Sequence, residues 1–349
     1  MSLKKDYNFS YKKSGIDVQK ANKLIKKAKP LINSTRTSNA FGEIGGFGGL
    51  FKINPKNYKQ PLLVAATDGV GTKLLIAEKL KKFDTLGVDL VAMSVNDIIV
   101  QGAKPLFFLD YLAVNKLNEK IFLSILKGIT KGCLEAGCSL IGGETAELPG
   151  IYPKGGFDLA GFCVGIVEKS KLLPNGKTKA GDLLIGLPSN GIHANGFSLI
   201  RKIISEKKIS LSKKIFSNYT LGSLLLKPTK IYVKSVLKIL KSNIKVTAIA
   251  HITGGGLEDN LKRVIPNNLG FSINKNTLAF SKKNNIYFWL KNDCKIPEKE
   301  LLKTFNCGIG MIIVIPKSEK NNLYKVCNLI KQPLVEVGEI TSNKKNNFF

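Results

Sequence analysis

Lysine is spread along almost the whole chain, and the windows that lack it constrain the fold more than any other feature. The 349 residues contain 54 Lys and Arg but only 25 Asp and Glu. Windows without Lys or Arg include 60–72, 83–103, 132–153, 183–200, 246–261 and 304–316. Apolar runs and glycines fill these windows, which is typical of buried elements joined by tight turns.

Apolar periodicity in and around these windows predicts a mixture of strands and helices. The expected strands are 62–66, 106–114, 139–143, 159–168, 183–187, 246–250 and 310–315. The expected helices are 17–32 (closing near Pro30), 88–102, 120–137 (capped by Gly137), 195–207 and 228–241. Mixed elements with glycine-rich junctions favour an α/β or α+β fold, and the polar tail 341–349 is expected to fray.

The chain is long for one hydrophobic core, so two domains are expected. Residues 169–182 are rich in lysine, proline and glycine, as linkers often are, and the strand–helix pattern starts again after them. We therefore predict domains at 1–168 and 169–349.

The net charge of +29 is typical of nucleic-acid-binding proteins, yet other features argue against that class. Arginine occurs only at 36, 201 and 263, and no basic stripe is interleaved with aromatics. No apolar run approaches the roughly 18 residues of a membrane span, and the basic N-terminus lacks the apolar stretch of a secretory signal. Six cysteines without a CxxC pair favour a reduced, cytoplasmic chain.

Three of these windows carry acids or amides beside glycines. They hold Asp68; Asp89, Asn96 and Asp97; and Glu144 and Glu147, of which Asp68, Asp97 and Glu144 are the candidate metal ligands. Carboxylates in apolar surroundings need a positive partner, and with no basic side chain nearby a divalent cation is the simplest one. Asp68 could instead serve its glycine turn. Asp97 is harder to explain as structural, because aspartate is a mediocre helix former and this one is expected mid-helix. Separated acids of this kind suit Mg²⁺, which also takes phosphate oxygens and water.

The common nucleotide-binding motifs are absent. GKT at 176–178 has Lys171 where a P-loop requires its first glycine, GVGTK at 69–73 separates Gly from Lys, and no GxGxxG follows a strand. GGFGGL at 45–50 could bring backbone N–H groups close to an anion, or it could be a surface loop. The only two histidines, His193 and His251, both fall in glycine-rich, lysine-free windows, which favours a role in proton transfer or phosphate binding.

Several segments together resemble the aminoimidazole ribonucleotide synthetase (phosphoribosylformylglycinamidine cyclo-ligase) family. They include GGFGGLF, ATDGVGTKL, GVDLVAMSVNDIIVQGAKPLFFLDYLA, GCLEAGCSLIGGETAELPG, SNGIHANGFSLIRK and AIAHITGGG, and the resemblance runs through residues 10–316 in order. The acidic and glycine-rich parts alone would also fit selenophosphate synthetase or thiamine-monophosphate kinase. A reactive Cys or selenocysteine in the N-terminal loop would favour selenophosphate synthesis, and residues 1–50 contain none.

The resemblance implies a two-domain synthetase fold whose N-terminal sheets pair into a barrel across a homodimer. It implies ATP-dependent ring closure of formylglycinamidine ribonucleotide, releasing ADP and phosphate, in purine biosynthesis. It also implies residue roles. The acids that bind Mg²⁺ and its phosphates would be Asp68, Asp97 and Glu144, and the loop that covers the phosphates would contain Gly45, Gly46, Gly48 and Gly49. The lysines near the phosphates would be Lys13 and Lys73. The polar groups that face substrate or phosphates would be His193, Asn195 and His251. His251, His193 and Asp68 are the candidates for taking part in catalysis.

Overall fold

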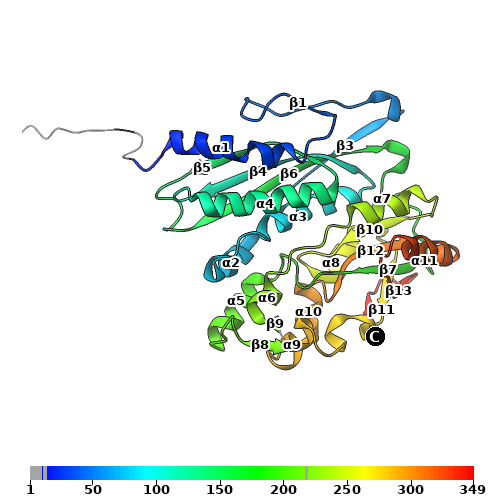
Figure 1. Ribbon diagram of the computed structural model, residues 1–349. Coiled ribbons are helices and arrows are strands. Elements are labelled where there is room, and N and C mark those ends of the chain that lie inside the picture. Colours follow the sequence, from blue (N-terminus) through cyan, green and yellow to red (C-terminus); the bar gives the residue numbers. More distant parts are fainter. Residues whose placement is uncertain (1–9, 11–13, 217–218) are drawn as a thin grey trace, which may run out of the picture.

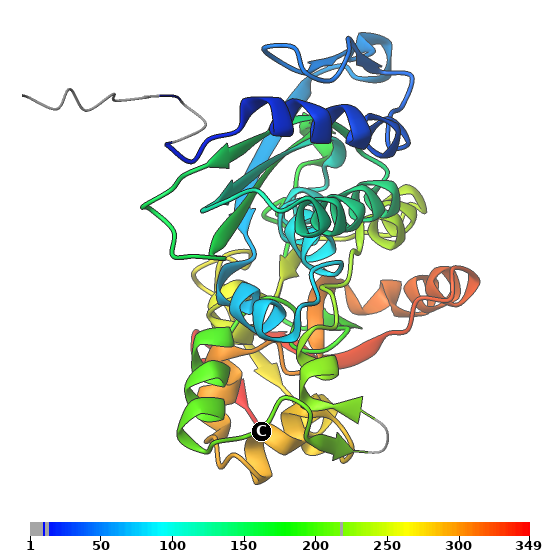
Figure 2. The same cartoon turned by 60° about the vertical axis from the view of Figure 1, so that its left-hand side comes forward.

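The computed structural model describes residue 10, residues 14–216 and residues 219–349, so Lys13 lies outside the described part of the chain. Two sheets, one from each half of the chain, form two lobes stacked one above the other (Figures 1 and 2). The mixed sheets and helices confirm the α/β (α+β) class. The domain boundary at 168/169 stays a prediction. No helix in the described ranges has the length and apolar character needed to cross a bilayer.

The first half is built on a four-stranded sheet with the order β3-β6-β4-β5. Its elements are α1 (Val18–Asn33), β1 (Ala40–Phe41), β2 (Leu50–Phe51), β3 (Pro61–Gly69), α2 (Leu74–Leu80), α3 (Leu86–Val100), β4 (Lys104–Val114), α4 (Glu119–Ala136), β5 (Ser139–Glu147) and β6 (Phe157–Glu168). Strand β6 runs antiparallel to both β3 and β4, whereas β4 and β5 are parallel. It follows that β3, β4 and β5 all point the same way.

The second half is built on a six-stranded sheet with the order β10-β12-β7-β13-β11-β14. Its elements are β7 (Leu183–Pro188), α5 (Phe197–Glu206), β8 (Lys214–Phe216), β9 (Tyr219–Thr220), α6 (Leu221–Leu225), α7 (Val233–Lys241), β10 (Ala248–His251), α8 (Gly256–Lys262), β11 (Gly270–Ile273), α9 (Ile286–Asn292), α10 (Glu298–Thr304), β12 (Ile309–Ile315), α11 (Lys320–Leu329), β13 (Val335–Thr341) and β14 (Asn347–Phe348). All its pairings are antiparallel except β11 with β14.

Helix α3 lies between the two halves. It packs on β3 and β6 of the first sheet and also contacts β10 and α7 of the second half. Its residues are buried almost all round, as expected of a helix with protein on every side. Close packing on α4 is possible because Gly87 lacks a side chain: a Cβ there would lie 2.2 Å from Ile129 N. A polar residue on α3 therefore reaches either the junction or a buried partner.

The sheet of the first half has one covered face and one open face. Helix α3 covers one side, where a Cβ on Gly165 would contact Ile98. The opposite side exposes Leu63 (61%), Tyr111 (39%) and Phe162 (38%), which stand on three neighbouring strands. The expected buried strand at 62–66 is thus half-exposed, because this sheet carries no second layer within the described chain.

The predicted helix 17–32 is present as α1, with Pro30 inside it. The proline ring is exposed, so the carbonyl left without its donor can be solvated. Two other expectations about local structure are wrong. The predicted helix 228–241 begins only at Val233. The tail is ordered: Asn347–Phe348 pairs with β11, and the Phe348 ring lies 5.8 Å from that of Phe271 in an edge-on contact.

Candidate functional site

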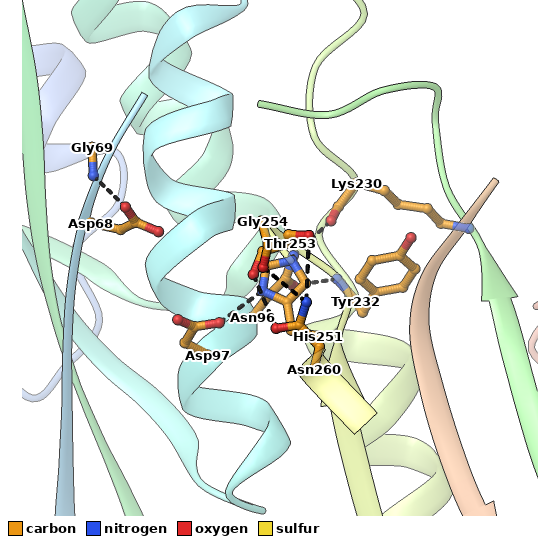
Figure 3. Close-up of polar contacts among 10 residues, drawn as sticks. All are labelled: Asp68, Gly69, Asn96, Asp97, Lys230, Tyr232, His251, Thr253, Gly254 and Asn260. Atoms are coloured by element: carbon orange, nitrogen blue, oxygen red, sulfur yellow. Dashed lines mark hydrogen bonds and ion pairs between the residues drawn. The ribbon is translucent and has the colours of Figure 1, made fainter. Parts of the chain in front are cut away.

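Asp97 and His251 form a pair at the junction between the two halves (Figure 3). Asp97 lies on α3 and His251 is the last residue of β10, and His251 Nδ1 is 2.7 Å from Asp97 Oδ1. A carboxylate can only accept, so His251 donates from Nδ1–H, and its Nε2 lies 3.5 Å from Asn96 Nδ2. The Asp97 side chain is 46% exposed but that of His251 only 2%. The Asp97 carboxylate therefore faces the solvent, and the buried His251 imidazole donates a hydrogen bond to it from the protein interior.

Asp68 lies near this pair, on β3 and facing α3 (Figure 3). Its Oδ1 accepts a hydrogen bond of 2.8 Å from the Gly69 N–H. Burial raises the pKa of Asp68, and the charge of Asp97 raises it further, against the lowering effects of the Gly69 hydrogen bond and His251. Two carboxylates that repel each other across a partly exposed space gain from a shared cation. This donor chemistry fits Mg²⁺.

Asn195 reaches the same junction from the second half. A Cβ on Gly254 would lie 3.5 Å from Asn195 Oδ1, so the amide stands beside the glycine turn that follows His251. Asn260 holds this turn by donating from Nδ2 to the Gly254 carbonyl at 3.2 Å (Figure 3). The same Nδ2 also donates to the Gly256 carbonyl at 2.7 Å. The structure thus brings Asp68, Asp97 and His251 together, and it places Asn195 beside the turn that follows His251.

His193 has a different environment from His251. It is buried, and its Nε2 accepts hydrogen bonds from the backbone N–H groups of Asn190 (3.1 Å) and Lys230 (3.4 Å). Burial, followed by the charges of His251 and nearby lysines, holds the pKa of His193 well below its usual value. Its backbone is left-handed, with φ of 68°. This neutral ring fixes a turn, and the expected role of His193 in proton transfer stays a prediction.

Lys73 lies in a buried ion pair, and its expected role at the nucleotide phosphates stays a prediction. Its side chain is fully buried, and Nζ is 2.7 Å from Asp89 Oδ2. Nζ also donates to the backbone carbonyls of Lys227 and His193. The premise that acids in lysine-free windows lack basic partners is therefore wrong for Asp89, because Lys73 lies just outside its own window and folds onto it.

Glu144 and the glycine loop lie at the other edge of the first sheet. Strand pairing aligns Asp68 with Gly161, Asp110 and then Gly143, so three spacings of about 4.8 Å separate the rows of Asp68 and Glu144 by roughly 14 Å. Within the described residues, no group of three or more His, Cys, Asp or Glu side chains could hold one metal ion. The predicted set of Asp68, Asp97 and Glu144 therefore does not converge within one subunit.

A cavity of about 540 Å³ lies beside Glu144. It is formed by α1, α4, β5 and the glycine loop, and its lining includes Gly45, Gly46, Gly48, Gly49 and Glu144. Phe47, at the tip of this loop, is fully exposed. Gly49 passes over the edge of β5 so closely that a Cβ there would lie 2.7 Å from the Ile141 side chain. The loop is thus placed over an opening of the size that ligands occupy.

Asp110 also lines this cavity and was not predicted. Burial raises the pKa of Asp110 to about 7, against the lowering effect of a backbone hydrogen bond. An acid inside the apolar run LFFLDYLAV was the signal available in the sequence. The six cysteines, by contrast, are as expected: all are buried free thiols.

Known proteins are similar to this chain in sequence and in fold. The profile described as AIR synthase related protein, N-terminal domain, matches residues 52–167, and the one described as its C-terminal domain matches residues 179–349. A phosphoribosylformylglycinamidine cyclo-ligase from Thermoanaerobacter sp. (strain X514) is 48% identical over 338 residues, covering 96% of this chain and 98% of the relative.

Solved structures of more distant proteins have the same fold. Thiamine-monophosphate kinase from Stenotrophomonas maltophilia is similar at a TM-score of 0.65 and 16% identity, covering 93% of this chain and 95% of that one. Hydrogenase maturation protein HypE, solved in complex with ATP, is similar at a TM-score of 0.64 and 14% identity, covering 92% and 86%. The two matched profiles together span most of the chain, which therefore belongs to the AIR synthase related protein family.

Proposed function

We propose that this protein catalyses the ATP-dependent ring closure of formylglycinamidine ribonucleotide to aminoimidazole ribonucleotide, with release of ADP and phosphate, in purine biosynthesis. The observation that carries the proposal is the 48% identity, over nearly the full length of both chains, to a relative named for this activity. ATP would activate the formyl oxygen, and a nitrogen of the same substrate would then attack that carbon. The required test is formation of the aminoimidazole product from this substrate, Mg²⁺ and ATP.

The residues at the junction suit the charge handling that such a reaction needs. Asp68 and Asp97 would hold Mg²⁺, which when bound neutralises phosphate charge. His251 would keep the Asp97 carboxylate oriented through its Nδ1–H. Asn195 offers an amide to a polar substrate group. Positioning of this kind accounts for much of the rate in reactions at phosphate.

The cavity of about 540 Å³ would take ATP, with the loop from Gly45 to Gly49 covering its phosphates. Its protein walls are apolar along α1 and α4, as a base-binding surface requires, and the glycines allow close approach of backbone N–H groups. Glu144 then stands at the phosphate end.

A homodimer formed through the open face of the first sheet would unite these two parts. Leu63, Tyr111 and Phe162 make that face apolar and exposed, as expected of an interface. If two such sheets close a barrel around a two-fold axis along the barrel, β5 of each subunit lies beside β3 of the other. Both strands point the same way, so the Glu144 edge of one subunit meets the Asp68 edge of its partner at one end of the barrel.

The proposal retains the cytoplasm as the location, which buried free thiols suit. We expect no binding to nucleic acid or membrane: the lysine excess would then give only weak, salt-sensitive retention on DNA. Selenophosphate synthesis or thiamine-monophosphate phosphorylation is the competing activity, and both would use the same acids and ATP.

A further inference from the structure

A fully buried ion pair joins the two halves of the chain next to the candidate site. Lys73 and Asp89 both belong to the first half, and each has a side-chain exposure of 0%. Their remaining hydrogen bonds all cross to the second half. Lys73 Nζ lies 2.8 Å from the Lys227 carbonyl oxygen and 3.0 Å from that of His193, while Asp89 Oδ1 accepts from the N–H and the hydroxyl of Thr229, each at 2.7 Å.

The polar face of α3 extends this arrangement by two turns. Asn96 Nδ2 donates to the Lys230 carbonyl (2.9 Å) and Asn96 Oδ1 accepts from the Tyr232 N–H (3.0 Å). The extended segment 227–232 is therefore held to α3 at successive backbone groups. Figure 3 shows Asn96 reaching this segment beside the Asp97–His251 pair.

The same contacts fix the turn that contains His193. Lys73 binds its carbonyl, and the ring accepts from the Lys230 N–H, so the turn is linked to the segment 227–232. Asn195 follows two residues later and stands beside Gly254. A change in how this turn sits on α3 would move Asn195 relative to Asp97.

Stability alone does not explain a buried charge pair. Taking both charges out of water costs about as much as their attraction returns, and apolar side chains of similar volume often serve as well. The pair instead fixes orientation, because its four hydrogen bonds to the second half are satisfied together in only one placement of those segments.

We propose that Lys73 is a positioning residue: with Asp89 it holds the His193 turn and the segment 227–232 against α3, and so fixes Asn195 beside the Gly254 turn that follows His251. The predicted change in KM rests on the proposed function, whereas the predicted change in hydrogen exchange does not depend on it. Lys73 touches neither the ATP cavity nor the exposed carboxylates. It acts on the half of the site that would face formylglycinamidine ribonucleotide.

The test removes both charges together, so that neither is left buried alone. Lys73→Met with Asp89→Leu is compared with a matched control, Lys202→Met with Glu206→Leu, which removes an ion pair of 3.8 Å that is 69% and 66% exposed. Hydrogen exchange of intact protein without substrates is followed by mass spectrometry. In the double variant, exchange of peptides 189–196 and 226–233 should rise about tenfold or more, with β4 and β6 unchanged. The control should match the wild type.

Kinetics give the second readout. The KM for formylglycinamidine ribonucleotide should rise about tenfold or more in the Lys73/Asp89 variant, with the KM for ATP within about twofold of wild type. A folded variant with unchanged exchange and unchanged KM values would overturn the inference. If the wild type makes no aminoimidazole product, the proposed function fails while the exchange measurement still decides the inference. If the double variant does not fold, Thr229→Val decides it: exchange of 226–233 should rise, and unchanged exchange would refute the role.

Discussion

A mixed dimer tests whether the acids at opposite sheet edges serve one active site. Asp68 and Glu144 lie roughly 14 Å apart within a subunit, by three strand spacings of about 4.8 Å. In the proposed barrel they meet across the interface. A heterodimer of one Asp68→Asn subunit and one Glu144→Gln subunit would then contain one site with both substitutions and one with neither.

The expected activities follow from counting intact sites. Each homodimeric variant should lose roughly 100-fold or more in kcat, since each site lacks one acid. The heterodimer, purified through two different affinity tags, should recover about half of the wild-type kcat per dimer. A matched control pairs Asp68→Asn with Asp97→Asn, two acids from the same edge, and should recover nothing. Production of aminoimidazole ribonucleotide is the assay.

Two results would refute this reasoning. If the Asp68→Asn/Glu144→Gln heterodimer is as inactive as its parents, the acids do not act across an interface. If both heterodimers recover activity equally, the sites are not built from one edge of each subunit. Sedimentation of the wild type as a monomer at assay concentrations would also contradict the proposed dimer.

Four further predictions concern single side chains. Asp97→Asn should lower activity roughly 100-fold and weaken the use of Mg²⁺. Its melting temperature should stay close to that of the wild type, because the Asp97 side chain is 46% exposed. His251→Gln should lower activity less, because His251 only orients Asp97, and activity measured across a Mg²⁺ titration tests both variants. Asp110→Asn should raise the free energy of unfolding above that of the wild type, and by more at pH 8 than at pH 5, as measured by urea unfolding. In the wild type, the pKa of Asp110 is raised from 3.8 to about 7 by folding, so its contribution to the free energy of unfolding is full below pH 3.8 and is lost as the pH rises through 7. The full shift corresponds to about 4 kcal/mol, and roughly half of that is expected for this half-buried carboxyl. Phe348→Ala should cost about 2 kcal/mol in the same assay, less than a core phenylalanine because the ring is half-buried, and no change would mean that the tail pairing contributes nothing.

Local structure was predictable where one segment decides it. Helix α4 ends at Ala136 with Gly137 in the left-handed region at φ 74°, as the apolar stripe and the glycine indicate. Asp97 stood out because it interrupts an apolar helix, and it does reach the junction. The two glycine-flanked histidines were both selected by the same pattern, yet only His251 contacts a carboxylate there.

The remaining features depend on long-range pairing that no local pattern encodes. Strand order places β6 and β4 between Asp68 and Glu144, and neither spacing nor composition gives that order. The partner of Asp89 is Lys73. Inspection of each sequence window by itself cannot reveal this pair, because the contact forms only when α3 packs on β3. Likewise, the polar tail is ordered because β11 offers it an edge, which propensity alone does not reveal.

The central claim is the identity of the reaction, and one comparison of acceptors tests it most directly. The protein is incubated with Mg²⁺ and ATP and, separately, with formylglycinamidine ribonucleotide, thiamine monophosphate or selenide, and ATP consumption is measured together with each product. We predict ATP consumption only with formylglycinamidine ribonucleotide, with one aminoimidazole ribonucleotide formed per ATP. ATP consumption with either other acceptor and none with formylglycinamidine ribonucleotide would contradict the account.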